Sequence, residues 1–449
     1  MDKTTDMTQG PIARQLILFS LPLLGSSLIQ QLYNTVNLIF VGHLLGKEAS
    51  AAVGASGLLV TCLVGFFTGM SIGSGVTAAR CYGAKDYKNL THTIHTAMAI
   101  SLGGGFVLMI LGLIASPMFL RWMNTPDDIL QQATGYIRVY FLSVIPLITY
   151  NIGSGILRAL GDSKSPMLYQ LIGGIVNISA NALCIIVLDW GVNGSAVASL
   201  CSQSIAAFLI LRHLRRVDSR YRLRWRKIKL YSESAGKILK VGIPSGIQST
   251  AITFSNIFIQ YHINSLGVDV IAAFTAYFKV ELFVYLPIMA FGQAATAFTG
   301  QNIGAGYVER VKKSAKAGIV VGICFTIILS SFLLIFARQA FGLFTTDVSV
   351  IDIGVSLAHI TFPLQFIYVF LEVFASTIRG AGKATAPMVI VLINMCGMRI
   401  ILLQIFISLW PSAQGVALTY PVTWLITALC MAVYYRFGRW VSRIKTVTK

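Results

Sequence analysis

Four charged side chains lie well inside long apolar runs of the sequence. Of the sixteen acidic residues, only Glu281 and Glu372 lie away from tails, loops and run ends, and the matching basic residues are Lys279 and Arg399. Charge in such surroundings usually pairs and usually marks an ion or substrate path. We expect Arg399 to pair with Glu281 or Glu372, whereas a helix directs Lys279 and Glu281 to different sides. These four residues are candidates for binding and releasing an ion; a static ion pair is the alternative.

A second candidate site lies in the first half of the chain and contains no acid. Its members are polar residues in four separate apolar stretches, namely Asn37, Tyr136, Asn177, Asn181 and Ser199. Asn177 and Asn181 are four residues apart and share one helix face. The cluster either lines a polar cavity or holds helices together by amide hydrogen bonds, each worth about 0.6–2 kcal/mol.

The sequence lacks the motifs of the common hydrolytic and metal-dependent enzymes. The sequence contains no GxxxxGK[ST], HExxH or GxSxG motif, so ATP hydrolysis, zinc proteolysis and serine hydrolysis are not indicated. His92 and His95 are three residues apart without a third ligand, and the seven cysteines show no CxxC spacing. We therefore expect no metal and no organic cofactor. An intramembrane enzyme would need a nucleophile–base or carboxylate pair that the sequence does not offer.

The surrounding sequence predicts an all-α membrane protein. The 449 residues are 55% hydrophobic and 11% charged, too little charge for a soluble protein of this length. Apolar runs of about 20 residues, long enough to cross a bilayer as helices, recur along the chain. We expect twelve spans, at residues 15–41, 51–76, 92–116, 132–157, 166–188, 192–212, 238–264, 270–297, 315–337, 355–377, 386–409 and 415–436.

Basic residues predict the orientation of these spans. They crowd every second connection and the C-terminal tail, and by the positive-inside rule these connections are cytoplasmic, as are both termini. The longest hydrophilic stretch, residues 212–229, then lies in the cytoplasm and explains much of the net charge of +19. We expect it to be a solvated linker that touches anionic lipid headgroups, and we expect no nucleic-acid partner.

The two halves of the chain resemble each other at a constant offset of 221 residues (382 − 161). At this offset Gly46 meets Gly267, Arg158 meets Arg379, and Gly161-x4-Pro166-Met167 meets Gly382-x4-Pro387-Met388. Two six-span repeats of the same orientation predict two pseudo-symmetric lobes with a cavity near the midplane. We expect a first lobe at residues 1–211, a cytoplasmic basic linker at 212–236, and a second lobe at 237–449.

Over essentially its whole length, the chain resembles the multidrug and toxic compound extrusion (MATE) family, in the bacterial branch similar to the DNA-damage-inducible F proteins. The stretches that carry the resemblance are 22-PLLGSSLIQQLYNTVNLIFVGHLLG-46, 153-GSGILRALGDSKSPM-167, 287-PIMAFGQAATAFTGQNIGAG-306 and 376-STIRGAGKATAPM-388. The resemblance implies a monomeric secondary antiporter of the bacterial inner membrane. It implies export of cationic or amphipathic organic compounds by alternating access, driven by H⁺ or Na⁺.

The resemblance also assigns residues. The family's first-lobe cation site falls on Asn37, Tyr136, Asn177, Asn181 and Ser199, and its helix-kink proline on Pro22. The branch typically has aspartate at the positions of Asn37 and Asn181, and an amide can neither take up a proton nor supply negative charge. Ion coupling is therefore expected in the second lobe, at Glu281, Glu372, Arg399 and Lys279. The runner-up function is a flippase for lipid-linked precursors, which several Arg and Lys residues in the cavity would favour.

Overall fold

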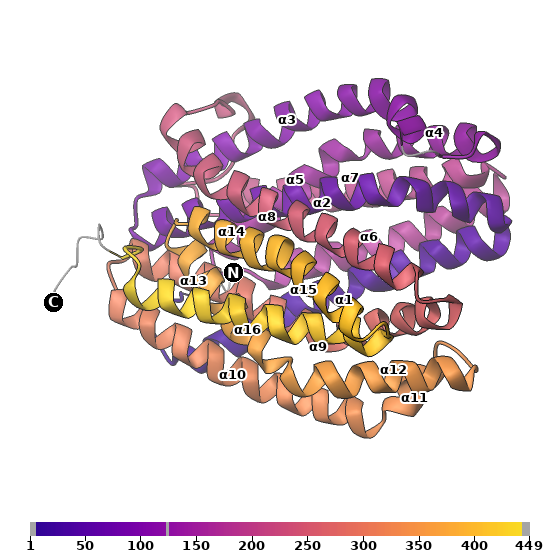
Figure 1. Ribbon diagram of the computed structural model, residues 1–449. Helices are drawn as coiled ribbons and strands as arrows, with labels where there is room; N and C mark the ends of the chain where they lie inside the picture. Colours follow the sequence, from indigo (N-terminus) through magenta and orange to yellow (C-terminus); the bar gives the residue numbers. More distant parts are fainter. Residues whose placement is uncertain (1–5, 123–124, 442–449) are drawn as a thin grey trace. The chain divides into compact units, whose positions relative to one another are not determined.

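The structure is a computed structural model that describes residues 6–122 and 125–441, and every regular element in that part of the chain is helical (Figure 1). The predicted all-α fold is therefore confirmed. The elements are α1 (Ile12–Leu44), α2 (Gly46–Gly83), α3 (Tyr87–Trp122), α4 (Asp127–Leu142), α5 (Val144–Ala159), α6 (Lys164–Asn181), η1 (Ala182–Val187), α7 (Gly191–Arg216), η2 (Trp225–Lys227), α8 (Ser232–Asn264), α9 (Val268–Gly304), α10 (Val308–Ile335), α11 (Ala337–Gly342), α12 (Val348–Thr361), η3 (Phe362–Leu364), α13 (Phe366–Gly380), α14 (Thr385–Val391), η4 (Leu392–Met398), α15 (Arg399–Leu409) and α16 (Ala413–Phe437).

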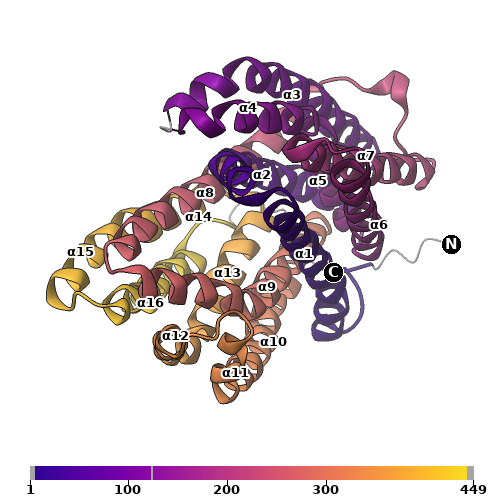
Figure 2. The ribbon, with the colours of Figure 1, turned by 90° about the vertical axis from the view of Figure 1, so that its right-hand side faces the viewer.

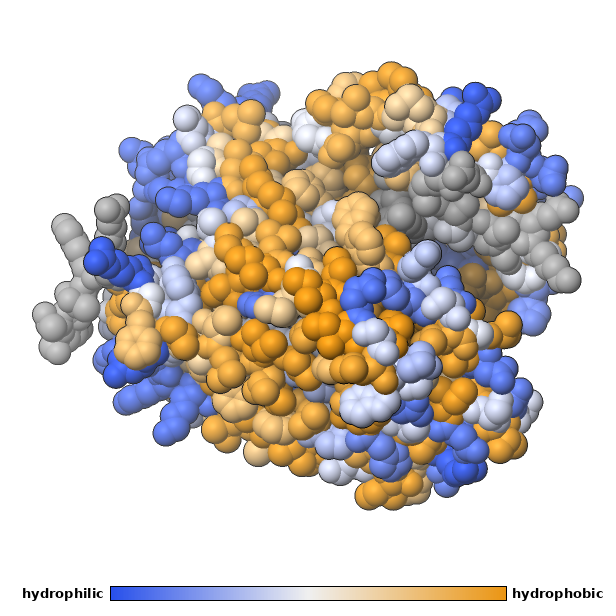
Figure 3. All heavy atoms as spheres, viewed as in Figure 1, coloured by the Kyte–Doolittle hydropathy of each residue, from blue (hydrophilic) through white to orange (hydrophobic). Residues whose placement is uncertain are grey.

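These helices account for the predicted spans. In the described chain, nine are individually long and apolar enough to cross a bilayer, and two bent pairs, α4–α5 and α12–α13, form two more. The pairs bend by 44° and 51°. The remaining predicted span is α8, which has 33 residues but carries buried polar Ser245, Gln248 and Ser255. Apolar side chains cover the outer face of α15 and α16, and hydrophilic ones gather toward the helix ends (Figure 3).

The chain forms two compact units. Of the described residues, unit 1 contains residues 6 and 25–246, and unit 2 contains residues 7–24 and 247–441. Within unit 1, α5 packs against α2, α3 and α7; within unit 2, α13 packs against α9, α10 and α16 (Figure 2). The boundaries of these units, at residues 24/25 and 246/247, differ from the expected lobe boundaries at 211/212 and 236/237. The linker belongs to unit 1, and α1 and α8 each pass from one unit to the other.

The repeat seen in the sequence is also present in the backbone. Gly46 and Gly267, at the offset of 221, have φ of 85° and 103°, and Gly161 and Gly382 have φ of 90° and 83°. These left-handed turns favour glycine because it has no Cβ. The two halves therefore repeat their turns as well as their helices.

Two helices, α1 and α8, are divided between the units. Polar contacts hold the segment that directly precedes each of these dividing helices. In unit 2, the Met7 amide donates to Gln301 Oε1 (3.1 Å), and Asn302 Nδ2 and Arg310 Nε donate to the Met7 carbonyl (3.0 and 3.3 Å). In unit 1, the linker backbone bonds to α3, where the Arg224 amide donates to His95 Nε2 (3.0 Å). Each clamp gives a buried backbone group a partner.

Candidate functional site

The buried acid Glu372 lies on α13 and forms an ion pair within unit 2. Its Oε1 accepts hydrogen bonds from Arg379 Nη2 (2.5 Å) and Ser376 Oγ (2.7 Å), and Arg379 also donates to Ser376 Oγ (2.7 Å). Only 4% of Glu372 and 8% of Arg379 is exposed. A Cβ on Gly292 of α9 would lie 2.5 Å from Glu372 Oε1, so this glycine provides the space for the carboxylate. The acid is held as a dry ion pair.

Glu281 lies on α9 and faces the break between α12 and α13. Gln365, the residue at this break, donates its Nε2 to Glu281 Oε1 over 3.4 Å. The neighbouring Tyr277 hydroxyl donates to Thr361 Oγ1 (2.9 Å). No cation lies within 4.0 Å of Glu281 among the described residues. Its carboxylate is therefore much less compensated than that of Glu372.

Arg399 begins α15, directly after the π-helical segment η4, and is 2% exposed. Its Nε and Nη2 approach Thr423 Oγ1 at 3.4 and 3.3 Å, and its guanidinium lies 5.2 Å from the ring centre of Tyr420. In the described chain it has no carboxylate within 4.0 Å, although its charge acts on Glu281 at longer range.

The expected pairing of Arg399 with Glu372 is therefore wrong, and its pairing with Glu281 is not a direct ion pair. The physical reason is that Arg379, seven residues after Glu372, lies two turns away on the same helix face. The sequence pattern E-x3-S-x2-R from residue 372 to 379 was the signal for this pair. Lys279, the fourth candidate, has an exposed side chain on α9 and contributes to neither acid.

The first half of the repeat lacks the acid of this ion pair. At the offset of 221, Glu372 corresponds to Asn151 and Arg379 to Arg158. Asn151 Nδ2 donates to the Leu147 carbonyl of its own helix (2.9 Å). The acid is therefore specific to unit 2, and unit 1 has a neutral amide at the corresponding position.

Unit 1 brings together three of its five predicted residues. Asn181 Nδ2 donates to Asn37 Oδ1 (2.6 Å) and lies 3.2 Å from Asn177 Oδ1. Asn177 and Asn181 are 1% and 0% exposed, and Asn177 Nδ2 and Asn181 Oδ1 have no hydrogen-bond partner among the described residues. Unpartnered buried polar atoms are costly and suit a site that a water molecule or ligand completes. Asn181 directly precedes the π-helical segment η1, a feature frequent at functional sites.

The other two predicted residues have separate partners. Ser199 Oγ donates to the Ser195 carbonyl (3.1 Å), and Tyr136 stacks on Tyr140 with ring centres 6.3 Å apart. Among the described contacts, neither bonds to the amide cluster.

Sequence reasoning missed a second polar group in unit 1. The Tyr33 hydroxyl is buried and accepts a hydrogen bond from Gln170 Nε2 (3.2 Å), and the amides of Gln30 and Gln203 lie beside it. The sequence signal for this group was a glutamine in each of three apolar stretches, Gln30, Gln170 and Gln203. The sequence analysis considered acids and asparagines and did not consider these glutamines. Pro22, the predicted kink proline, is buried inside α1 three residues before Gly25, where α1 passes into unit 1.

Two repeats of membrane-spanning helices, each with broken or π-helical segments beside buried polar residues, define the class of multi-span secondary transporters. The family model MatE matches the chain twice, over residues 22–183 and 244–405. The protein belongs to this family, the multidrug and toxic compound extrusion transporters, and is not an enzyme. The family prediction is confirmed.

Individual relatives agree with this assignment. The chain is 29% identical to the probable multidrug resistance protein YpnP of Bacillus subtilis over 444 residues, 98% of each chain. It is 23% identical to the multidrug export protein MepA of Staphylococcus aureus, over 83% of this chain and 84% of that one. A solved outward-facing multidrug resistance MATE family transporter superposes with a TM-score of 0.91 at 23% identity, covering 99% of each chain. That likeness confirms the two-lobed, twelve-span fold.

Proposed function

We propose that the protein is an ion-coupled antiporter that exports cationic or amphipathic organic compounds from the bacterial cytoplasm by alternating access. The coupling ion is H⁺ or Na⁺, since a carboxylate can bind either. Both termini and the linker lie in the cytoplasm. The relatives named as multidrug resistance and export proteins support the substrate class.

The observation that carries the proposal is the unequal compensation of the two acids in unit 2. Glu372 already holds a cation, Arg379, at 2.5 Å, so a proton or Na⁺ must compete with that guanidinium. Glu281 has a long hydrogen bond from Gln365, the Tyr277 hydroxyl beside it and no close cation among the described residues. Glu281 is therefore the acid that exchanges the ion, and Glu372 stays in its ion pair with Arg379.

Coupling follows from the position of Glu281 at a helix break. An ion and a substrate are coupled when they bias the same conformational equilibrium in opposite directions. Gln365, which bonds to Glu281, is the residue at the 51° bend between α12 and α13. The Gln365 amide and the distant Arg399 both stabilise the negatively charged form of Glu281. When Glu281 is neutralised by an ion, these stabilising interactions are weakened. Ion binding then changes the relative stability of two arrangements of the bend.

The test is efflux from proteoliposomes that contain the purified protein and an organic cation such as ethidium. A pH gradient and a Na⁺ gradient are imposed separately. We expect efflux to be accelerated by one of them and to be unaffected by dissipating the other. Equal rates with and without every gradient would contradict ion-coupled antiport. Movement of a lipid-linked precursor, without ethidium efflux, would identify a flippase instead.

A further inference from the structure

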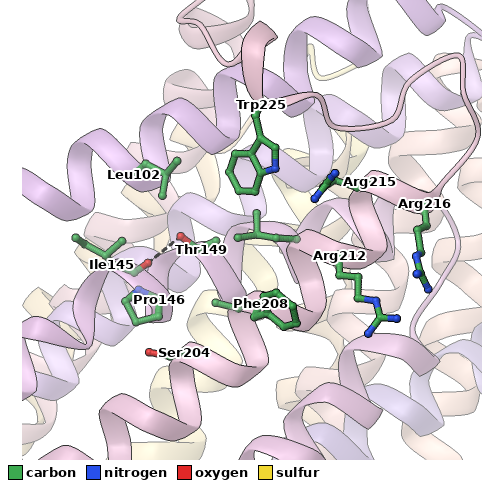
Figure 4. A pocket seen from close by; sticks show the side chains of 12 residues that line it. Leu102, Ile145, Pro146, Thr149, Ser204, Phe208, Arg212, Arg215, Arg216 and Trp225 are labelled. Atoms are coloured by element: carbon green, nitrogen blue, oxygen red, sulfur yellow. Dashed lines mark hydrogen bonds between the residues drawn. The ribbon is translucent and has the colours of Figure 1, made fainter.

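A groove on unit 1 combines an apolar wall with a cluster of arginines (Figure 4). It encloses about 630 Å³ between α3, α5 and α7 and is closed at one end by the linker. Apolar atoms dominate its wall, which contains Leu102, Ile145, Pro146, Ala207, Phe208 and Leu211. The hydroxyl of Thr149, also in the wall, is used internally because it donates to the Ile145 carbonyl (2.8 Å).

The arginines lie at the linker end of this groove. Arg212, Arg215 and Arg216 are exposed, and their side chains have no hydrogen bond or ion pair to any described residue. Arg215 and Arg216 lie in the last turn of α7, where cations also suit the helix dipole. Arg212 lies one turn earlier and needs another explanation. No acidic residue lines the groove.

The linker supplies no counter-charge. Residues 212–229 contain nine basic residues and one acid, Asp218. Arg220 holds that acid at 2.5 Å, and its hydrogen bonds lower the pKa of the Asp218 carboxyl. The groove therefore has three unpaired cations above an apolar wall.

Trp225 stands over the same end of the groove (Figure 4). Its side chain is 48% exposed, and the preceding amide, that of Arg224, is fixed by His95 Nε2. Tryptophan is enriched at the level of lipid headgroups because its ring is amphipathic. From Ser204 to Leu211 the wall runs about 10 Å along α7, compared with about 15 Å for one hydrocarbon leaflet. Along the groove, an apolar wall, a tryptophan and a group of arginines thus follow in the order of the acyl chain, the interface and the phosphate of a phospholipid.

We infer that this groove binds one anionic phospholipid of the leaflet at which the linker lies. The acyl chain packs on Phe208 and Leu211, and the phosphate accepts hydrogen bonds from Arg212, Arg215 and Arg216, as guanidinium groups favour. Three cations disfavour the organic cations proposed as substrates, and the apolar wall disfavours a free anion. The inference does not depend on transport activity.

The test uses quenching of Trp225 fluorescence by phospholipids brominated on the acyl chain near the headgroup. The protein is reconstituted in phosphatidylcholine vesicles with increasing fractions of brominated phosphatidylglycerol or brominated phosphatidylcholine. Subtracting the signal of Trp225→Phe isolates this residue from the other five tryptophans. We expect half-maximal quenching at an about tenfold lower fraction of phosphatidylglycerol, given the contribution of each basic residue near a headgroup. Equal quenching by both lipids would overturn the inference.

Two triple variants separate a built site from general attraction. Arg212→Gln, Arg215→Gln and Arg216→Gln together should abolish the preference. Arg222→Gln, Arg226→Gln and Lys229→Gln together remove the same charge from the same linker outside the groove and should retain it. Ser204→Phe places a large side chain in the apolar part of the groove and should reduce quenching by both lipids. Loss of preference in both triple variants would show diffuse electrostatics and contradict a defined site.

Discussion

At the residue scale, the compensation of each carboxylate decides its role. Removing one partner of a buried ion pair costs about 3–5 kcal/mol, because the other charge is left uncompensated. This cost applies to Glu372, because its partner Arg379 is buried with it. Among the described residues, the Glu281 carboxylate contacts only neutral groups, the Gln365 amide and the Tyr277 hydroxyl. We therefore expect changes at Glu372 to affect stability as well as transport, and changes at Glu281 to affect transport first.

The amide cluster of unit 1 gives a prediction of its own. Asn37→Asp keeps the oxygen that accepts from Asn181 Nδ2 and adds a titratable group. We expect a folded protein whose transport rate acquires an additional dependence on pH, measured as ethidium efflux between about pH 5 and 8. Asn34→Asp, an exposed position one turn away on α1, is the matched control and should keep the parental profile. An unchanged profile in a stable Asn37→Asp protein would place Asn37 outside the working site.

Individual residues were predictable from the sequence to different degrees. The spacing of Asn177 and Asn181 predicted their shared face, and in the structure Asn37, a third predicted member of the site, bonds to Asn181. The pairing of Glu372 was missed because Arg379 was assigned to a cytoplasmic connection, whereas it ends α13 and reaches back two turns. The role of Gln365 was not predictable, because the break that presents it to Glu281 depends on tertiary packing.

At the element scale, one helix crossing in unit 1 depends on glycine. A Cβ on Gly69 of α2 would lie 2.2 Å from the Gly246 amide nitrogen of α8, and a Cβ on Gly73 would lie 2.4 Å from the Ile238 carbonyl oxygen. Gly242 faces the same crossing. Two small-xxx-small motifs thus let two backbones touch. At the offset of 221, unit 2 has Ala290 and Ala294, which pack in one cluster with Phe19 and Leu23 of α1.

Gly73→Ala should therefore destabilise the protein. The obstructing atoms belong to the backbone and cannot rotate away, so overpacking of about 1–3 kcal/mol is expected. The measurement is the thermal midpoint in detergent, followed by tryptophan fluorescence. Gly103→Ala on α3, where a Cβ meets nothing within 4 Å, should leave the midpoint unchanged or raise it, since alanine favours helix. Equal midpoints for both variants would contradict the close crossing.

Docking of the linker on α3 gives a second element-scale prediction. Because the Arg224 amide donates to His95 Nε2, the proton of the ring lies on Nδ1, which donates to the Thr91 carbonyl (2.7 Å). A protonated His95 cannot accept that amide, so this contact is present at high pH and is lost as pH falls through the pKa of the ring. Lys227, Arg224 and His92 are the neighbouring groups that carry or can carry positive charge.

Hydrogen exchange of the linker amides checks this docking. His95→Leu should increase the exchange of the Arg224 amide, corrected for intrinsic rate, by about tenfold, which corresponds to an unmet hydrogen bond of about 1–3 kcal/mol. It should also remove the pH dependence of the corrected rate. His92→Leu loses only its stacking on Tyr231 and should keep the Arg224 amide protected. Identical protection in the parent and His95→Leu would show that the linker is held by other contacts.

At the scale of the whole molecule, the sequence predicted the family, the duplication and the number of spans. It did not predict that α1 and α8 each belong to both units, because hydropathy marks where a helix crosses a membrane and not which neighbours it packs against. Pro22 and Pro244, where the two family-model matches begin, lie inside these two dividing helices.

The orientation of the molecule is a separate prediction. Ser219→Cys and Thr346→Cys place single exposed thiols in the linker and in the connection before α12, in a protein whose seven native cysteines are replaced. The positive-inside rule predicts that a membrane-impermeant maleimide labels Cys at 346 but not at 219 in intact cells. Both should be labelled after permeabilisation. The reverse pattern would invert the topology and with it the direction of export.

The central claim is that Glu281 exchanges the coupling ion, and Glu281→Gln tests it most directly. The variant keeps the shape of the side chain and the acceptor oxygen for Gln365 but cannot bind a proton or supply charge. Gradient-driven ethidium efflux should fall by about tenfold or more, within the usual range of coupling free energies, while ethidium binding persists. Glu309→Gln, at an exposed acid on α10, should transport at the parental rate. Parental efflux by Glu281→Gln under the same gradient would contradict the claim.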